Sequence, residues 1–224
     1  MRSAKTILTL GMALLICLLA FGTTLADDGG QTYSVTITNL TKKQVFSPPL
    51  LVSHKKSIKL FMAGQPASDG IAAIAEGGDT STLEALLGTL DEVNDFTTGG
   101  MMIKPSESMT LTVKTRGRFN QLSLVGMLVS TNDAIYAINS TTIPYFGKKS
   151  LMALAYDGGS EVNTELCSDL PGPPCTADSG NARVTDGAEG FIHVHSGIHG
   201  VGDLNEHNMD FNNPVAKIVI KRMK

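Results

Sequence analysis

The chain has 224 residues, a length that accommodates one or two domains. It carries 18 Lys and Arg against 21 Asp and Glu, for a formal net charge of −3, and this balance excludes the basic surface of a typical nucleic-acid-binding protein. With 42% hydrophobic and 17% charged residues the chain can bury a core, which excludes intrinsic disorder.

The first 26 residues have the pattern of a secretory signal peptide. Arg2 and Lys5 form a positive start, residues 7–21 are almost wholly apolar, and Ala26 ends a short segment suited to cleavage. The apolar run is shorter than the roughly 20 residues that a bilayer span needs. We therefore expect an exported protein, periplasmic or extracellular, whose mature domain covers residues 27–224 and which has no membrane association after leader cleavage.

Alternating apolar and polar residues predict β-strands along much of the mature chain. In residues 32–40, Tyr33, Val35 and Ile37 would form the buried face, and residues 109–113 alternate in the same way. Further strands are expected at residues 50–54, 58–62, 119–129, 150–156, 191–194 and 215–223. This spacing is typical of an all-β, antiparallel sandwich.

Residues 67–93 change to a helical period, which predicts a small helical insertion between early strands. Ser68 is suited to cap a helix over residues 69–76, which the following glycine pair would end. Ser81 and Glu84 match a capping box. The apolar positions of the second helix follow at helical spacing: Leu83, Leu86, Leu87 and Leu90. We expect this amphipathic helix to pack on the domain.

Two of the three cysteines, Cys167 and Cys175, lie in the mature domain. An even number of cysteines in an oxidising compartment predicts one disulfide. The bond would close a proline-rich loop of about nine residues, whose shortness limits the stabilisation to about 2–3 kcal/mol. A thiolate metal site is the alternative interpretation.

Several short motifs occur in an order that resembles one known family. They are Gly64-Gln-Pro-Ala-Ser-Asp-Gly70, Ala75-Glu-Gly-Gly78, Ser130-Thr-Asn-Asp133, Ala155-Tyr-Asp-Gly-Gly-Ser-Glu161 and the closing segment Pro214–Arg222. Together they resemble the spondin domain, which in animals belongs to secreted matrix proteins. A single such domain behind a leader is similar to the bacterial branch of the family. The resemblance implies a β-sandwich of C2-like type, an adhesion-type role without catalysis, and one bound calcium-like cation.

By the same resemblance, three acidic residues would hold the cation: Asp133, Asp157 and Glu161. Calcium takes oxygen ligands, and carboxylates supply the charge. Asp133 and Asp157 each follow a predicted strand, so both reach one rim if those strands end together, and Gly158-Gly159 would let Glu161 fold back beside them. Glu161 departs from the family pattern, which has Asp there. The other interpretation is that the aspartates are turn residues that bond their own backbone.

A second cluster consists of His193, His195 and His199. Alternate positions on a strand place the first two on one face, and imidazole suits copper or zinc. The His-x-His step is similar to a copper-binding segment of copper/zinc superoxide dismutases, but that enzyme needs six histidines and this chain has five. The alternatives are structural histidines bonded to carbonyls or carboxylates, and a pH-sensitive cluster.

Motifs of common hydrolases and nucleotide-binding enzymes do not occur: there is no G-x-S-x-G, no phosphate-binding loop and no H-E-x-x-H. The sequence therefore favours a non-enzymatic, calcium-binding interaction module, with an extracellular protein or glycan as the expected partner and no nucleic acid. The rival hypothesis is a copper or zinc protein, with a redox role, built on the histidine cluster. A secreted structural protein without a metal is the third.

Overall fold

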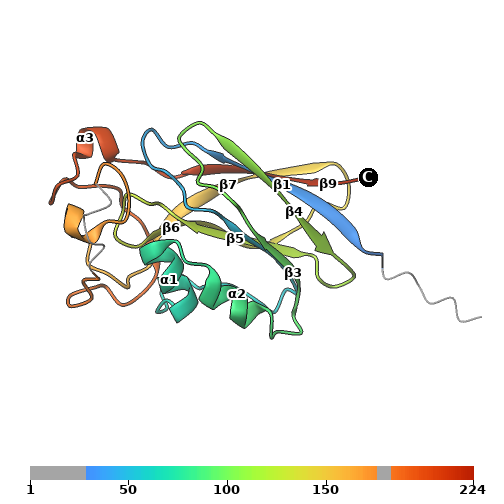
Figure 1. The fold of residues 1–224 in the computed structure, drawn as a ribbon. Coiled ribbons are helices and arrows are strands. Elements are labelled where there is room, and N and C mark those ends of the chain that lie inside the picture. The colour runs from blue at the N-terminus through green and yellow to red at the C-terminus, as the bar shows by residue number, and fades with distance from the viewer. Residues whose placement is uncertain (1–28, 176–182) are drawn as a thin grey trace, which may run out of the picture.

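The computed structural model describes residues 29–175 and 183–224, which form an antiparallel β-structure with short helices (Figure 1). The predicted leader at residues 1–26 lies outside the described residues. The strands are β1 (Gln31–Asn39), β2 (Leu50–His54), β3 (Val93–Thr98), β4 (Ser108–Thr115), β5 (Gln121–Met127), β6 (Ala134–Thr142), β7 (Lys148–Asp157), β8 (His193–Val194) and β9 (Ala216–Arg222). The helices are α1 (Asp69–Gly77), α2 (Ser81–Leu87) and α3 (Glu206–Met209), with a 3-10 turn at Cys167–Asp169. None of these helices has the length and apolar character needed to span a bilayer.

The strands form one curled sheet in the order β3-β2-β5-β6-β7-β9-β1-β4, with β8 added beside β7. Strand β7 joins the two halves, because residues 148–153 pair with β9 and residues 154–157 pair with β6. The two edges approach each other, where Lys114 N donates to Asp95 Oδ2 at 2.7 Å and Asn94 Nδ2 donates to Lys114 O at 2.8 Å. The sheet is therefore nearly closed and barrel-like. The all-β antiparallel class is confirmed, whereas the division into two packed sheets of a sandwich is not.

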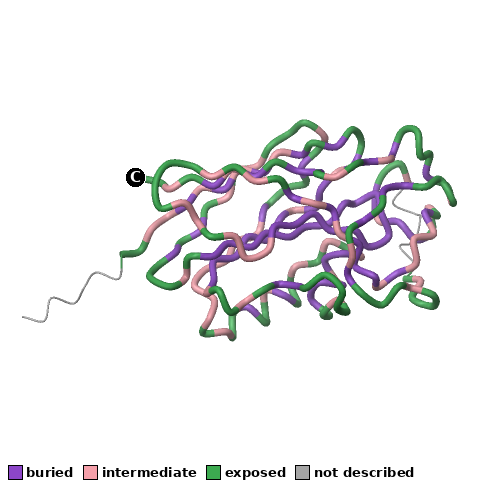
Figure 2. The backbone as a smooth tube through the Cα atoms, turned by 180° about the vertical axis from the view of Figure 1, so that it is seen from behind, coloured by how far each residue is buried: buried purple, intermediate pink, exposed green. Residues whose placement is uncertain are grey.

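The hydrophobic core has two parts, one on each side of β5. Leu122 and Leu124 face the interior of the curled sheet, together with Tyr136 of β6. Val125 instead faces outward, into a second cluster that α1 and α2 cover. All seven residues of β5 are buried as a result, which explains its continuous apolar run, and Figure 2 shows buried segments along the middle of the molecule.

The first predicted helix is confirmed at both ends. The Ser68 side chain caps α1 by accepting a hydrogen bond from Ile71 N, and Gly78 ends the helix at a φ of 70°. The predicted capping box of the second helix is wrong. The N-cap residue of α2 is Thr80, and Glu84 instead accepts hydrogen bonds from the hydroxyls of Thr80 and Thr98, at 2.6 and 2.5 Å. Glu84 thus ties α2 to β3.

Two strand predictions need correction. Residues 58–62 form no strand: Leu60 and Phe61 pack in the second cluster, and Asn139 holds their backbone through hydrogen bonds of 3.0 and 2.6 Å. The predicted strand at residues 191–194 shrinks to the two residues of β8. Strands β3 and β6 were not expected. The first five residues of β6 are buried on both faces, so its sequence lacks the alternation that reveals a half-buried strand.

Gly126 is required by the packing of Tyr136, which stacks on Phe46 with ring centroids 4.1 Å apart and donates to Ser47 O at 2.9 Å. A Cβ at position 126 would lie 2.4 Å from Tyr136 Oη. We expect Gly126→Ala to lower the free energy of unfolding by about 1–3 kcal/mol, measured by chemical denaturation. The matched control is Gly77→Ala, at a helical position with nothing within 4 Å, which should be neutral or slightly stabilising. Equal effects of the two substitutions would contradict this packing.

Candidate metal centre

The register of β6 and β7 brings two of the predicted acids to one rim of the sheet. Ala134, the first residue of β6, pairs with Asp157, the last residue of β7, so Asp133 and Asp157 are neighbours there. Glu161 follows after a short turn. All three side chains are buried, with exposed fractions of 0%, 1% and 3%, respectively. These three residues are called the acidic rim below.

Asp133 ties the turn that follows β7 to the rim. Its Oδ2 accepts hydrogen bonds from Ser160 N at 2.7 Å and from Glu161 N at 3.0 Å. Its Oδ1 is buried and has no hydrogen-bond partner. Burial, and then the nearby Asp157 carboxylate, raise the pKa of Asp133 to about 7. The rim thus contains a carboxylate oxygen that is removed from water and left without a donor, which is a costly arrangement without a cation or a proton.

Asp157 lies between the turn and the histidine segment. Its Oδ1 accepts from Gly159 N at 2.8 Å, and its Oδ2 accepts from Asn163 Nδ2 at 2.7 Å. The turn needs glycine at position 159, because φ is 62° and a Cβ would lie 2.3 Å from Phe191 O. On the other side, the Nε2 atoms of His193 and His195 lie 3.7 and 3.8 Å from the Asp157 carboxylate.

Glu161 faces a further acid that the sequence analysis did not select. Burial, then the Glu76 and Asp133 carboxylates, raise the pKa of Glu161 to about 7. Glu76 lies near the end of α1 and pairs with Arg183 at 2.7 Å between Nε and Oε2. The signal for Glu76 was present, since it belongs to the Ala75-Glu-Gly-Gly78 motif. Its place at a predicted helix end made it look structural.

In the described part of the chain, one set of three side chains places potential ligand atoms within 4.8 Å of one another: Asp157, Glu189 and His193. Glu189 is exposed and lies in the polar segment before β8, where no periodicity or motif marks it. The three carboxylates of the acidic rim do not converge to this distance, and Asp157 is the residue that the rim shares with the mixed acid–histidine set.

Hydrogen bonds distinguish the three histidines. His193 Nδ1 lies 3.1 Å from Val194 O and so carries a proton, and in the neutral ring the Nε2 atom, on the side of Asp157, keeps its lone pair. His195 is opposite: Nδ1 accepts from Gly197 N at 3.0 Å, which places the proton of the neutral ring on Nε2. Burial lowers the pKa of His195, which favours this neutral form. His193 can act as a metal ligand through Nε2, whereas His195 in this arrangement cannot.

His199 is not brought to the same point. Its Nε2 lies 3.1 Å from Ser196 Oγ, and its backbone N donates to Glu165 Oε1 at 2.6 Å. The predicted set of His193, His195 and His199 therefore does not form a three-histidine ligand group in the described residues. His193 and His195 both approach the Asp157 carboxylate through Nε2, but the proton of neutral His195 lies on that atom, and His199 Nε2 bonds to Ser196 instead.

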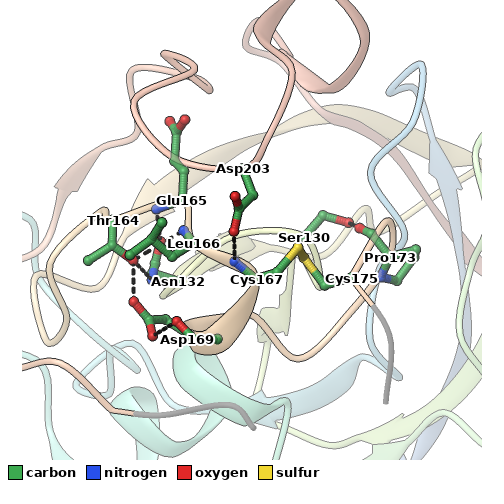
Figure 3. Close-up of a disulfide and its surroundings, with 11 residues drawn as sticks. Ser130, Asn132, Thr164, Glu165, Leu166, Cys167, Asp169, Pro173, Cys175 and Asp203 are labelled. Carbon is green, nitrogen blue, oxygen red and sulfur yellow. Dashed lines mark hydrogen bonds between the residues drawn. A yellow bond between two sulfur atoms is a disulfide. The ribbon is translucent and has the colours of Figure 1, made fainter. Parts of the chain in front are cut away.

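The predicted disulfide between Cys167 and Cys175 is confirmed, and Figure 3 shows it beside Ser130 and Pro173. Cys167 N donates to Asp203 Oδ2 at 2.9 Å, and the Ser130 hydroxyl bonds to Pro173 O. Asn132 Oδ1 accepts from Glu165 N at 3.1 Å. The disulfide-closed segment is thus bonded to Ser130, and Glu165 just before that segment is bonded to Asn132, immediately before Asp133 in the chain.

The raised pKa of Asp133 gives a pH dependence whose sign is fixed. An aspartate has a pKa of about 3.9 when unfolded, and here it is about 7, so the folded chain holds a proton that the unfolded chain has released. This stabilisation is present below about pH 4 and is lost as pH rises through about 7. In chelator, the melting temperature of Asp133→Asn minus that of the wild type should therefore rise over this window. A difference in melting temperature between the two proteins that stays constant over this pH range would contradict the raised pKa of Asp133.

A comparison with models of known protein families identifies the family of this chain. The family model described as Spondin_N matches residues 33–161, which is more than half of the chain and includes the whole acidic rim. The segment with Glu189 and the three histidines lies beyond the matched range. No curated protein matches the sequence. The chain belongs to the spondin N-terminal domain family.

Proposed function

We propose that this domain is an exported, non-catalytic, adhesion-type module whose acidic rim is ordered by one calcium ion, held by Asp133, Asp157 and Glu161. One observation carries the proposal: Asp133 and Asp157 are buried as neighbours at one rim, Glu161 is buried in the turn that follows, and Asp133 Oδ1 has no hydrogen-bond partner. Family membership supports the same role, because spondin N-terminal domains are generally non-catalytic.

The chemistry of the rim suits a hard cation. Buried carboxylates are stable only if they are paired, protonated or bound to a metal. Calcium accepts six to eight oxygen ligands in flexible geometry, including backbone carbonyls and amides. Two side-chain amides lie near the rim: Asn132 Nδ2 donates to Thr164 Oγ1, and Asn163 Nδ2 donates to Asp157 Oδ2. The residues present therefore fit calcium in type and charge.

The cation would serve to fix a surface. It would neutralise the mutual repulsion of Asp133, Asp157 and Glu161 and hold the loop before β6 against the turn after β7. The disulfide-closed segment, which is bonded to the same loop, would become part of one rigid pole. We infer that an extracellular protein or glycan binds this pole, and the disulfide is consistent with a periplasmic or extracellular location.

A second candidate function has its own observation. Asp157, Glu189 and His193 place ligand atoms within 4.8 Å of one another, and the lone pair of His193 Nε2 is free. Two carboxylates with one imidazole suit zinc or copper better than calcium. Such a site would replace the three-histidine hypothesis, since only one of those histidines takes part.

Thermal melting in chelator, calcium, zinc and copper tests these alternatives. A cation that binds only the folded state stabilises it by about 2.7 kcal/mol at 100 times its dissociation constant. For the calcium proposal, the gain in melting temperature should occur with calcium and be lost in Asp157→Asn and Glu161→Gln, while His193→Ala keeps it. For the second candidate, the gain should occur with zinc or copper and be lost in His193→Ala, while Glu161→Gln keeps it.

The matched control is Asp186→Asn, which removes one exposed carboxylate from the segment before β8 that also contains Glu189. It should keep the full calcium response, because Asp186 belongs to neither set. A calcium response that Asp186→Asn weakens as much as Asp157→Asn would indicate unspecific charge screening. No response to any of the three cations, in a protein that still melts cooperatively, would contradict both candidates.

A further inference from the structure

The end of the domain opposite the acidic rim carries large apolar side chains in the open. Tyr145 and Phe146, at the turn between β6 and β7, are 73% and 79% exposed, and Met223, just after β9, is 45% exposed. Strand β6 has nine residues, which at about 3.3 Å per residue places this end roughly 27 Å from the rim. Figure 1 shows the end of β9 and the start of β1 here, away from α3 and the loops near the rim.

Cations surround these apolar side chains. A groove of about 780 Å³ is lined by Tyr145, Phe146 and Met223 together with Lys148, Lys221, Arg222 and Lys224. We call these seven residues the basic end. Two adjoining grooves add Lys55, Arg116 and Arg118, and no acidic residue lines any of the three grooves among the described residues. This concentration of positive charge stands out in a chain whose net charge is −3.

We propose that the basic end docks on an anionic phospholipid surface, with Tyr145, Phe146 and Met223 inserted among the headgroups and the lysines against lipid phosphates. Exposed aromatic side chains beside Lys and Arg are the combination that binds a membrane interface, since apolar burial and charge attraction then add. Clustered exposed apolar side chains rimmed by charged residues are typical of sites that bind a protein or a membrane. The association is peripheral and departs from the expectation of no membrane association.

The arrangement of the rings favours lipid over a sugar chain. The rings of Tyr145 and Phe146 are nearly perpendicular, at 89° with centroids 4.5 Å apart, so they do not form one flat platform for successive sugars. The Arg222 guanidinium lies over the Tyr145 ring, 5.8 Å from its centroid, and donates to Gln31 Oε1 at 2.6 Å. Arg222 therefore positions the turn, while Lys148, Lys221 and Lys224 are exposed and can meet phosphates.

Docking at the basic end would direct the acidic rim away from the lipid surface, because the two lie at opposite ends of β6 and β7. A partner could then reach the rim while the domain is held at a membrane. The inference does not depend on the metal: vesicle binding should be the same in calcium and in chelator, so the two proposals can fail separately.

Co-sedimentation of protein purified from the exported fraction with lipid vesicles tests the proposal. We expect binding to vesicles of phosphatidylcholine with phosphatidylglycerol, and not to phosphatidylcholine alone. Replacing one of Lys148, Lys221 or Lys224 by Gln should weaken binding about fivefold, and the double variant Tyr145→Ser/Phe146→Ser should abolish it. Two controls change exposed apolar and exposed cationic side chains elsewhere, Met101→Ser/Met102→Ser and Lys42→Gln/Lys43→Gln, and should leave binding unchanged.

A second readout uses the absence of tryptophan from this chain. The emission of Phe146→Trp should shift to shorter wavelength on anionic vesicles, whereas that of Met102→Trp should not. Equal binding to neutral vesicles, or full binding by the Tyr145→Ser/Phe146→Ser variant, would overturn the proposal. Absence of vesicle binding together with retention on a sulfated polysaccharide column, lost in the lysine variants, would overturn it in favour of a glycan.

Discussion

The burial of carboxylates where β6 meets β7 is the constraint on which this end of the molecule depends. Asp133 occupies the loop before β6, and the register between the two strands leaves no position for it except beside Asp157. Its Oδ2 accepts hydrogen bonds from the backbone of residues 160 and 161, which holds the turn that carries a third acid against the rim. Such a group needs a positive charge or protons, and this need links the fold to the proposed metal.

The rest of the architecture supports that rim from behind. Strand β5 is buried on both faces, because the helices pack on one side of it and the interior of the curled sheet lies on the other. The position of the loop that follows β5 is fixed as a result. The disulfide-closed segment bonds to this loop through Ser130, and Glu165 just before that segment bonds to Asn132. The opposite end has no comparable acidic cluster among the described residues and is basic and apolar. The two ends are thus suited to different partners.

The sequence allowed much of this to be predicted where one physical signal dominates. Alternation in residues 32–40 and 109–113 located strands because each has one wet face, and Ser68 marked a helix start because its hydroxyl satisfies a free N–H. Strand β6 was missed because burial on both faces removes alternation. Glu189 was missed because no motif or periodicity in the sequence indicates that its side chain lies close to His193. The different tautomers of His193 and His195 depend on backbone positions that no sequence pattern records.

The metal content of the exported protein, purified without chelator, tests the central claim most directly. Mass spectrometry of the metals in the wild type and in Asp157→Asn would count the ions per chain. The account predicts about one calcium per chain in the wild type and none in the variant. A correctly folded wild type that binds no divalent cation, even when calcium is supplied, would contradict it. Stoichiometric zinc that disappears in His193→Ala would move the site to Asp157, Glu189 and His193.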